Sequence, residues 1–301
     1  MTLHFVSLFR HFVPYKSHLV YPKKCRTRVV LHFLLIHFSL CTIHHTFLQS
    51  PPLFLTNIAI SMAFLIDLLY TIVIFNTLSI ENWHKRTLMR KEIDLNTWDR
   101  KEHFEFFSRN ATPHYCVAFN IDVTNLLHFT RANKLSFYYS LVYLCTQTVN
   151  EIDAFLMETE DNKVYAIDQR IASFIDLAKG STVFHVVCLP QQQDIFAFCS
   201  QAREQSTNNP LTLQQSCQIT DPKVIFSCLP WLDMTTCTNE RDYTDPKLKD
   251  DTAPIIVWGK YVQKDGKFTL NMTLDVNHRL IDGYHIGQFA QKLQNKIDSL
   301  C

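Results

Sequence analysis

Glycine is scarce in this sequence. Only five glycines occur in 301 residues, where average usage would place roughly twenty. Loops that cradle phosphate groups need clustered glycines, because their backbone amides must approach the ligand closely. No segment of the chain carries such a cluster. The sequence therefore excludes P-loop nucleotide-binding proteins and Rossmann dinucleotide-binding proteins.

Two further patterns are missing. The 29 basic residues face 28 acidic residues, so the chain lacks the basic surplus with which proteins neutralise nucleic-acid phosphates. Ten cysteines are present, but none stand as C-x-x-C or at another spacing typical of metal sites. A chain of this length can build a large core without disulfides, so we expect reduced cysteines and a cytoplasmic protein.

The first 88 residues differ in composition from the rest. Leu53–Leu78 holds a single charged residue, Asp67, and is long enough to form a membrane-spanning helix. Val29–Leu48 is a poorer span because it contains four histidines. Three interpretations stay open: a membrane anchor, a targeting segment, or sequence that precedes a true start at Met89. We expect a hydrophobic extension at 1–88, with membrane contact only if 53–78 is an anchor, and a soluble domain at 89–301.

Helical and strand patterns alternate from Met89 onward, which predicts an α/β domain. Ser136–Val149 has apolar residues at helical spacing, and Thr238–Thr252 is expected to be a charged loop. The other expected elements are strands at Val117–Val123, Val164–Ile171, Thr182–Leu189 and Val224–Leu229, and helices at Trp98–Arg109 and Gln191–Glu204.

The clearest pattern lies near the C-terminal end of the sequence. Positions 268–276 alternate strictly between apolar and polar residues, which is typical of a strand with one buried face. The same alternation places His278 on the apolar side, and Asp282 and Gly283 then precede an amphipathic helix ending near Leu300. A histidine in this position suits a general base, because burial keeps its imidazole neutral and able to accept a proton.

Other interpretations of these residues stay open. A histidine followed by an aspartate is also typical of a hydrogen-bonded turn without a catalytic role. A metal site formed by His278, Asp282 and His285 would lack further ligands at fixed spacing. For Cys228 we expect a buried thiol rather than a nucleophile, since no base can be assigned to it.

Residues 276–289, VNHRLIDGYHIGQF, resemble the H-x-x-x-D-G active-site block of the chloramphenicol acetyltransferases. Further segments match in the family's order at 98–107 (WDRKEHFEFF), 137–150, 182–185 (TVFH), 227–231 (SCLPW) and 254–261 (PIIVWGKY). The resemblance spans Ile93–Ser299. It implies an α+β two-layer sandwich, in which a mixed β-sheet carries helices on one face, and acetyl transfer from acetyl-coenzyme A to a hydroxyl group.

The resemblance also implies roles for individual residues. His278 would be the base that takes the proton of the acceptor hydroxyl, and Ser227 would donate a hydrogen bond to the tetrahedral oxyanion. Arg100 would pair with Asp282 and support the loop that carries His278. No metal and no covalent acyl-enzyme are implied.

The remaining implied roles concern substrates and assembly. Lys260 and Tyr261 match positions near the coenzyme, where a cation favours the nucleotide phosphate. Phe107 and Phe184 match positions that contact the acceptor. The family forms homotrimers with each active site at a subunit interface, so acetyl-coenzyme A, a small hydroxylated acceptor and further copies of the chain are the expected partners.

The sequence departs from the family pattern at four positions. Asn277 replaces the first histidine of the usual pair, and Leu156 stands where an arginine is common. Val257 replaces a threonine that commonly holds a water molecule, and Phe107 stands where a tyrosine often contacts the drug. We expect an O-acetyltransferase acting on chloramphenicol. An enzyme with another hydroxyl acceptor, an inactive homologue and a membrane-tethered form stay open.

Overall fold

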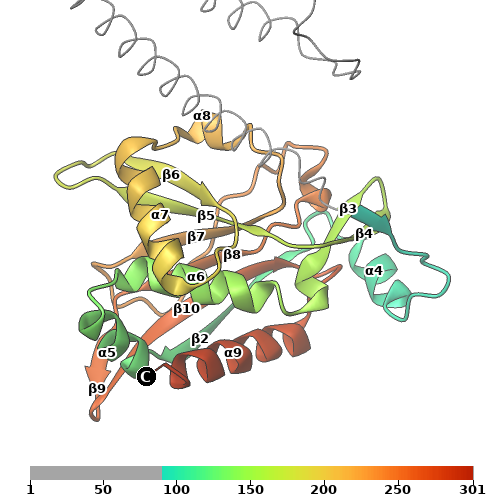
Figure 1. The fold of residues 1–301 in the computed structure, drawn as a ribbon. Coiled ribbons are helices and arrows are strands. Elements are labelled where there is room, and N and C mark those ends of the chain that lie inside the picture. Colours follow the sequence, from blue (N-terminus) through green and yellow to red (C-terminus); the bar gives the residue numbers. More distant parts are fainter. Residues whose placement is uncertain (1–89, 301) are drawn as a thin grey trace, which may run out of the picture. The chain divides into compact units, whose positions relative to one another are not determined.

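The computed structural model describes residues 90–300. Its main feature is a seven-stranded sheet in which six strands follow the order β2-β10-β8-β7-β5-β6 and β9 pairs with β10 (Figure 1). The strands are β2 (His114–Asp122), β5 (Ile171–Leu177), β6 (Phe184–Leu189), β7 (Lys223–Leu229), β8 (Ile255–Gly259), β9 (Val262–Lys264) and β10 (Lys267–Asn277).

The sheet is mixed, as expected. Strand β7 runs parallel to both β5 and β8, whereas β10 is antiparallel to β2, β8 and β9, and β6 is antiparallel to β5. A separate three-stranded sheet has the order β1-β4-β3 and consists of β1 (Arg90–Glu92), β4 (Lys163–Ile167) and β3 (Met157–Glu160).

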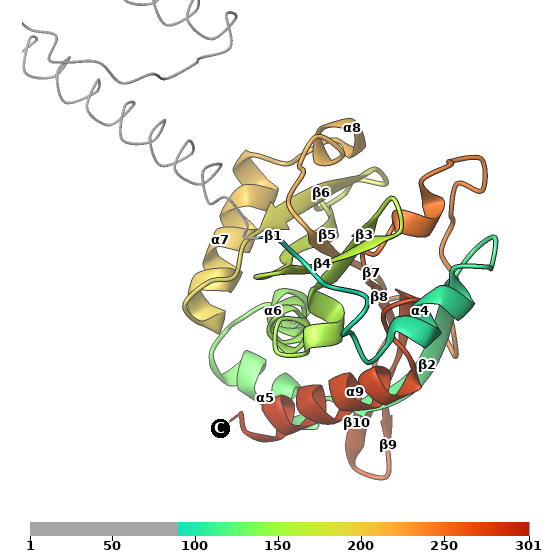
Figure 2. The ribbon, with the colours of Figure 1, turned by 90° about the vertical axis from the view of Figure 1, so that its right-hand side faces the viewer.

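Helices cover one face of the main sheet (Figures 1 and 2). The core between the two layers includes Phe226 and Trp258 from the sheet and Leu141 and Val142 from α6, each at most 1% exposed. The α-helices are α4 (Lys101–Phe107), α5 (Thr124–Ala132), α6 (Phe137–Val149), α7 (Ile195–Asn208), α8 (Leu213–Ser216) and α9 (Gly283–Asp298), with 3₁₀ turns η1 (Asp153–Leu156) and η2 (Leu248–Asp250).

Residues 230–253, which we term the covering segment, pack on the opposite face of β10 and β8. Arg241 donates from Nη2 to Asp275 Oδ1 at 2.7 Å, and the amide of Cys237 donates to Thr273 Oγ1 at 3.1 Å. A Cβ added to Gly259 would lie 2.6 Å from Met234 Cγ and 2.7 Å from the carbonyl oxygen of Leu232. The segment therefore contacts β8 where only glycine leaves room.

Most of the expected elements are present. The helix at 136–149 is confirmed as α6, which Ser136 caps by accepting from the amide of Tyr139 at 3.3 Å. The expected strand Val164–Ile171 is wrong, because β4 ends at Ile167 and β5 begins at Ile171. The chain turns between them, where the buried Arg170 donates to the carbonyl oxygens of Phe155 and Met157.

The hydrophobic runs Val29–Leu48 and Leu53–Leu78 and the expected start at Met89 lie outside the described residues. Among residues 90–300, no helix is both long and apolar enough to cross a membrane.

Candidate active site

His278 lies directly after β10, where the sequence pattern places it. Leu274 and Val276, which precede it on the same face, are fully buried in the core. The amide of His278 donates to the carbonyl oxygen of Pro113 at 2.7 Å, so the pairing between β10 and β2 extends one residue beyond the two strands. This contact fixes the backbone from which the imidazole projects.

Two aromatic rings enclose the imidazole of His278. The ring of Phe107, the last residue of α4, stacks on it with centroids 3.7 Å apart and planes 21° apart. The ring of Tyr115, on β2, lies 4.1 Å from it at 33°. His278 is half-buried in this position.

The surroundings of His278 lower its pKa below the usual 6.5. Burial is the main cause, because it disfavours the charged form. The negative charge of Asp282 opposes the shift, whereas Arg100 and His103 add to it. The imidazole is therefore neutral at pH 7 and can accept a proton, as a general base must.

Arg100 and Asp282, which the resemblance pairs, are in contact. Arg100 Nη1 donates to Asp282 Oδ2 at 2.8 Å, and both side chains are largely buried. Asp282 also caps α9 by accepting from the amide of Tyr284 at 3.0 Å, and its own amide donates to His285 Nδ1 at 3.2 Å. Burial alone would raise the pKa of Asp282, but the contact with Arg100 and the charge of His285 lower it below its usual value.

Asn277 points away from His278 and fixes the covering segment. Its Nδ2 donates to the carbonyl oxygens of Lys249 and Asp251 at 2.8 and 3.0 Å, and its Oδ1 accepts from the amide of Arg279. The residue that departs from the family's histidine pair therefore has a structural function in this chain.

Ser227 lies far from His278 within one chain. Ser227 is level with Val257 of β8, which is level with Thr273 of β10, five residues before His278. Two interstrand spacings and five residues along a strand separate their Cα atoms by about 19 Å. Alternation also places Ser227 on the face opposite the core residue Phe226.

The expected coenzyme-binding residues, Lys260 and Tyr261, and the expected acceptor residue Phe184 lie away from His278. Lys260 and Tyr261 follow β8 at the end remote from His278; Lys260 is exposed, and the ring of Tyr261 packs 5.3 Å from that of Phe137. Phe184 is 44% exposed on the edge strand β6. One chain thus carries a base group (His278, Phe107, Arg100 and Asp282), whereas Ser227, Lys260, Tyr261 and Phe184 lie elsewhere.

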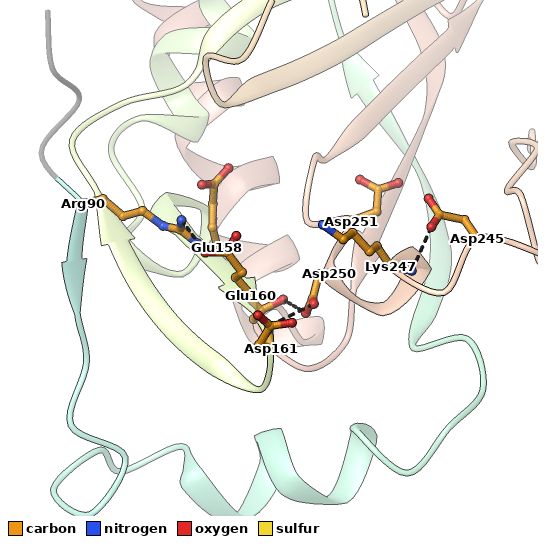
Figure 3. Close-up of a pocket in the computed structure, with 9 residues that line it drawn as sticks. Arg90, Glu158, Glu160, Asp161, Asp245, Lys247, Asp250 and Asp251 are labelled. Atoms are coloured by element: carbon orange, nitrogen blue, oxygen red, sulfur yellow. Dashed lines mark hydrogen bonds and ion pairs between the residues drawn. The ribbon is translucent and has the colours of Figure 1, made fainter.

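An acidic cavity of 390 Å³ lies between β3 and the covering segment (Figure 3). Asp250, on its wall, accepts from Nη2 of the buried Arg279 at 2.9 Å. Its carboxylates outnumber its cations, which disfavours the phosphates of a nucleotide. Among the residues described, no three His, Cys, Asp or Glu side chains are grouped to hold a metal ion. The cavity is lined by Arg90, Glu158, Thr159, Glu160, Asp161, Asp245, Lys247, Asp250 and Asp251.

Sequence reasoning missed Tyr115, although it contacts the imidazole. The expected strand began at Val117, whereas β2 begins at His114. The proline at position 113, which often stands at a strand boundary, is the one local signal that could have moved the start.

Comparisons with known proteins identify the family of this chain. The family model for chloramphenicol acetyltransferase matches residues 88–294. Chloramphenicol acetyltransferase 3 of Escherichia coli is 26% identical over 211 residues, which cover 69% of this chain and 97% of that protein. The chloramphenicol acetyltransferase of Clostridium perfringens is 28% identical over 205 residues, covering 67% and 92%.

Solved structures show the same fold. A chloramphenicol acetyltransferase superposes with a TM-score of 0.63 at 22% identity, covering 69% of this chain and all of that one. A dihydrolipoamide acetyltransferase of Azotobacter vinelandii superposes with a TM-score of 0.50 at 17% identity, covering 66% and 86%. The chain therefore belongs to the chloramphenicol acetyltransferase family and is an acyltransferase.

Proposed function

We propose that this protein transfers the acetyl group of acetyl-coenzyme A to a hydroxyl of chloramphenicol, with His278 as the general base. The observation that carries the proposal is the neutral imidazole of His278, half-buried between two aromatic rings. The relatives named above, which are chloramphenicol acetyltransferases, support the acceptor.

The proposed reaction proceeds by direct attack. A ring nitrogen of His278 takes the proton of the acceptor hydroxyl while its oxygen bonds to the thioester carbonyl carbon, giving a tetrahedral oxyanion. The oxyanion then collapses, the carbon–sulfur bond breaks, and the imidazolium returns its proton to the coenzyme A thiolate. Ser227 would donate a hydrogen bond to the oxyanion, a contribution of typically about 3 kcal/mol.

A homotrimer is part of the proposal. His278 and Ser227 cannot reach one substrate from a single chain, because their Cα atoms are about 19 Å apart and their side chains leave opposite faces of the sheet. A neighbouring copy can supply the missing group to each site. Lys260 and Tyr261 would then bind the coenzyme, and Phe107 and Phe184 would contact the acceptor.

We also propose that residues 89–301 form the acetyltransferase domain and that it works in the cytoplasm. All seven cysteines among residues 90–300 are free thiols, as in a reducing compartment. Cell fractionation of the full chain and of a chain beginning at Met89 tests this. Recovery of only the longer chain with membranes would instead support an anchor at 53–78.

A different hydroxyl acceptor is the second candidate. Val257, level with Ser227, is buried and has no hydroxyl group, and Phe107 likewise offers no hydroxyl beside His278. Both features make the acceptor side less polar than in the family pattern. This favours an acceptor that needs fewer hydrogen bonds than chloramphenicol.

Thiol release from acetyl-coenzyme A, measured with the full chain, tests the function. Chloramphenicol should accelerate it, and His278→Gln should slow it by about 10²–10⁴-fold. His128→Gln, a change on the exposed side of α5, is the matched control and should have no effect. Equal rates for the protein and His278→Gln would refute the mechanism. Acceleration only by other alcohols or sugars would support the second candidate.

A further inference from the structure

Tyr115 contacts both ends of the turn that carries the candidate base. Its ring lies 4.1 Å from the imidazole of His278, and its hydroxyl donates to the carbonyl oxygen of Ile281 at 3.4 Å. Tyr115 is paired with Val276 across the β2–β10 ladder, so the two side chains project from the same face. The backbone of Pro113, two residues earlier, holds the amide of His278.

The tyrosine hydroxyl is protonated at neutral pH. Burial, together with the negative charge of Asp282, raises the pKa of Tyr115 to about 12. The side chain is therefore an uncharged ring with a hydrogen-bond donor at its tip. It can shield the imidazole without competing for the proton that a base must accept.

We propose that Tyr115 is a positioning residue for His278, closing the second face of the imidazole and tying the 278–281 turn to β2. This inference rests on the proposed function, in which His278 is the base. Phe107 covers one face of the imidazole but belongs to α4 and makes no contact with the turn's backbone among the hydrogen bonds described. Among residues 90–300, Tyr115 is the aromatic residue that combines ring contact with the imidazole and a hydrogen bond to the turn.

The charged and titratable groups around His278 determine how removal of the Tyr115 ring should change the pKa of His278. Arg100 and His103 face it from the α4 side, and Asp282 faces it from the turn. None of these charges depends on the Tyr115 ring, whereas burial of the imidazole does. Loss of the ring should admit water to one face and move the pKa of His278 upward, toward 6.5.

The test uses variants of the full chain and a reagent for neutral imidazole. Diethyl pyrocarbonate modifies unprotonated histidine, and mass spectrometry of the peptide containing His278 gives the modification rate at each pH. We expect the midpoint of this rate profile to move to higher pH in Tyr115→Leu and Tyr115→Ile. Tyr115→Phe, which keeps the ring, should retain the original midpoint.

Tyr165→Leu is the matched control, because it removes a tyrosine ring from β4 and should leave the midpoint unchanged. In acetyl transfer, Tyr115→Leu should lower kcat by about tenfold with little change in KM, as misplaced catalytic groups do. An unchanged midpoint in a folded Tyr115→Leu or Tyr115→Ile variant would overturn the proposal. Labelling needs no substrate, so it gives its answer even if chloramphenicol and acetyl-coenzyme A do not react.

Discussion

Mixing two inactive variants tests whether each active site draws on two copies of the chain. His278→Ala keeps Ser227, and Ser227→Ala keeps His278. Each change alone should reduce activity strongly, by about 10²–10⁴-fold for the base and 10²–10³-fold for the oxyanion donor. The register of β7, β8 and β10 separates the two residues in one chain, so each variant can still supply the group that the other lacks.

The expected recovery of activity follows from the fraction of sites that contain both an intact His278 and an intact Ser227. In a trimer assembled at random from equal amounts of the two variants, about one quarter of the sites pair an intact His278 with an intact Ser227. Co-expression of the variants with two different tags, followed by purification through both, gives the mixed assemblies. Purification through both tags leaves only trimers that contain both variants, and in each of these one site of three has both intact residues. Thiol release per mole of chain should therefore approach about one third of the unmodified rate.

A second mixture separates the alternatives. The unmodified chain is combined with the double variant His278→Ala/Ser227→Ala at equal amounts. Sites shared between copies retain about one quarter of full activity, whereas sites within one chain retain about one half. Mixed single variants that stay as inactive as their parents would refute the shared site.

Three further predictions concern the base group and its surroundings. In the pH profile of kcat/KM, the midpoint of the acid limb should lie below pH 6.5, because a lowered pKa keeps His278 unprotonated to lower pH. A midpoint above 6.5 would contradict this. Asp282→Ala should reduce the free energy of unfolding in urea by about 2 kcal/mol, because it removes the α9 cap and the Arg100 contact. Asp282→Asn can still cap the helix and should reduce the free energy of unfolding by less. Cys228→Ala should keep the thiol-release rate, because burial raises the pKa of Cys228 to about 12 and keeps the thiol protonated; a large loss would indicate a nucleophile.

Local patterns in the sequence were sufficient to predict the strand and the helix on either side of the candidate base His278. The alternation along β10 and the helical spacing along α9 depend on which side chains face the core, and both elements occur where expected. The short helix α5 was missed. The single strand expected at Val164–Ile171 was wrong, because the chain turns between β4 and β5, where the buried Arg170 contacts residues distant in sequence.

The site itself needed more than local patterns. Arg100 and Asp282 are 182 positions apart, and only the family resemblance suggested that they meet. Neither periodicity nor spacing could show that Ser227 lies about 19 Å from His278, since this distance depends on strand order and register. Tyr115 was missed because a three-residue error at the start of β2 left it outside the expected strand.

The close approach of the covering segment at Gly259 limits how this protein can vary. Lys260 follows that glycine directly, and its amide donates to the carbonyl oxygen of Leu232 at 2.7 Å. Any larger side chain at 259 would displace Leu232 and Met234 and would shift the lysine with them. Under the proposed function, in which Lys260 binds the coenzyme, redesign of this corner for other acyl donors should therefore leave position 259 untouched and begin at its neighbours.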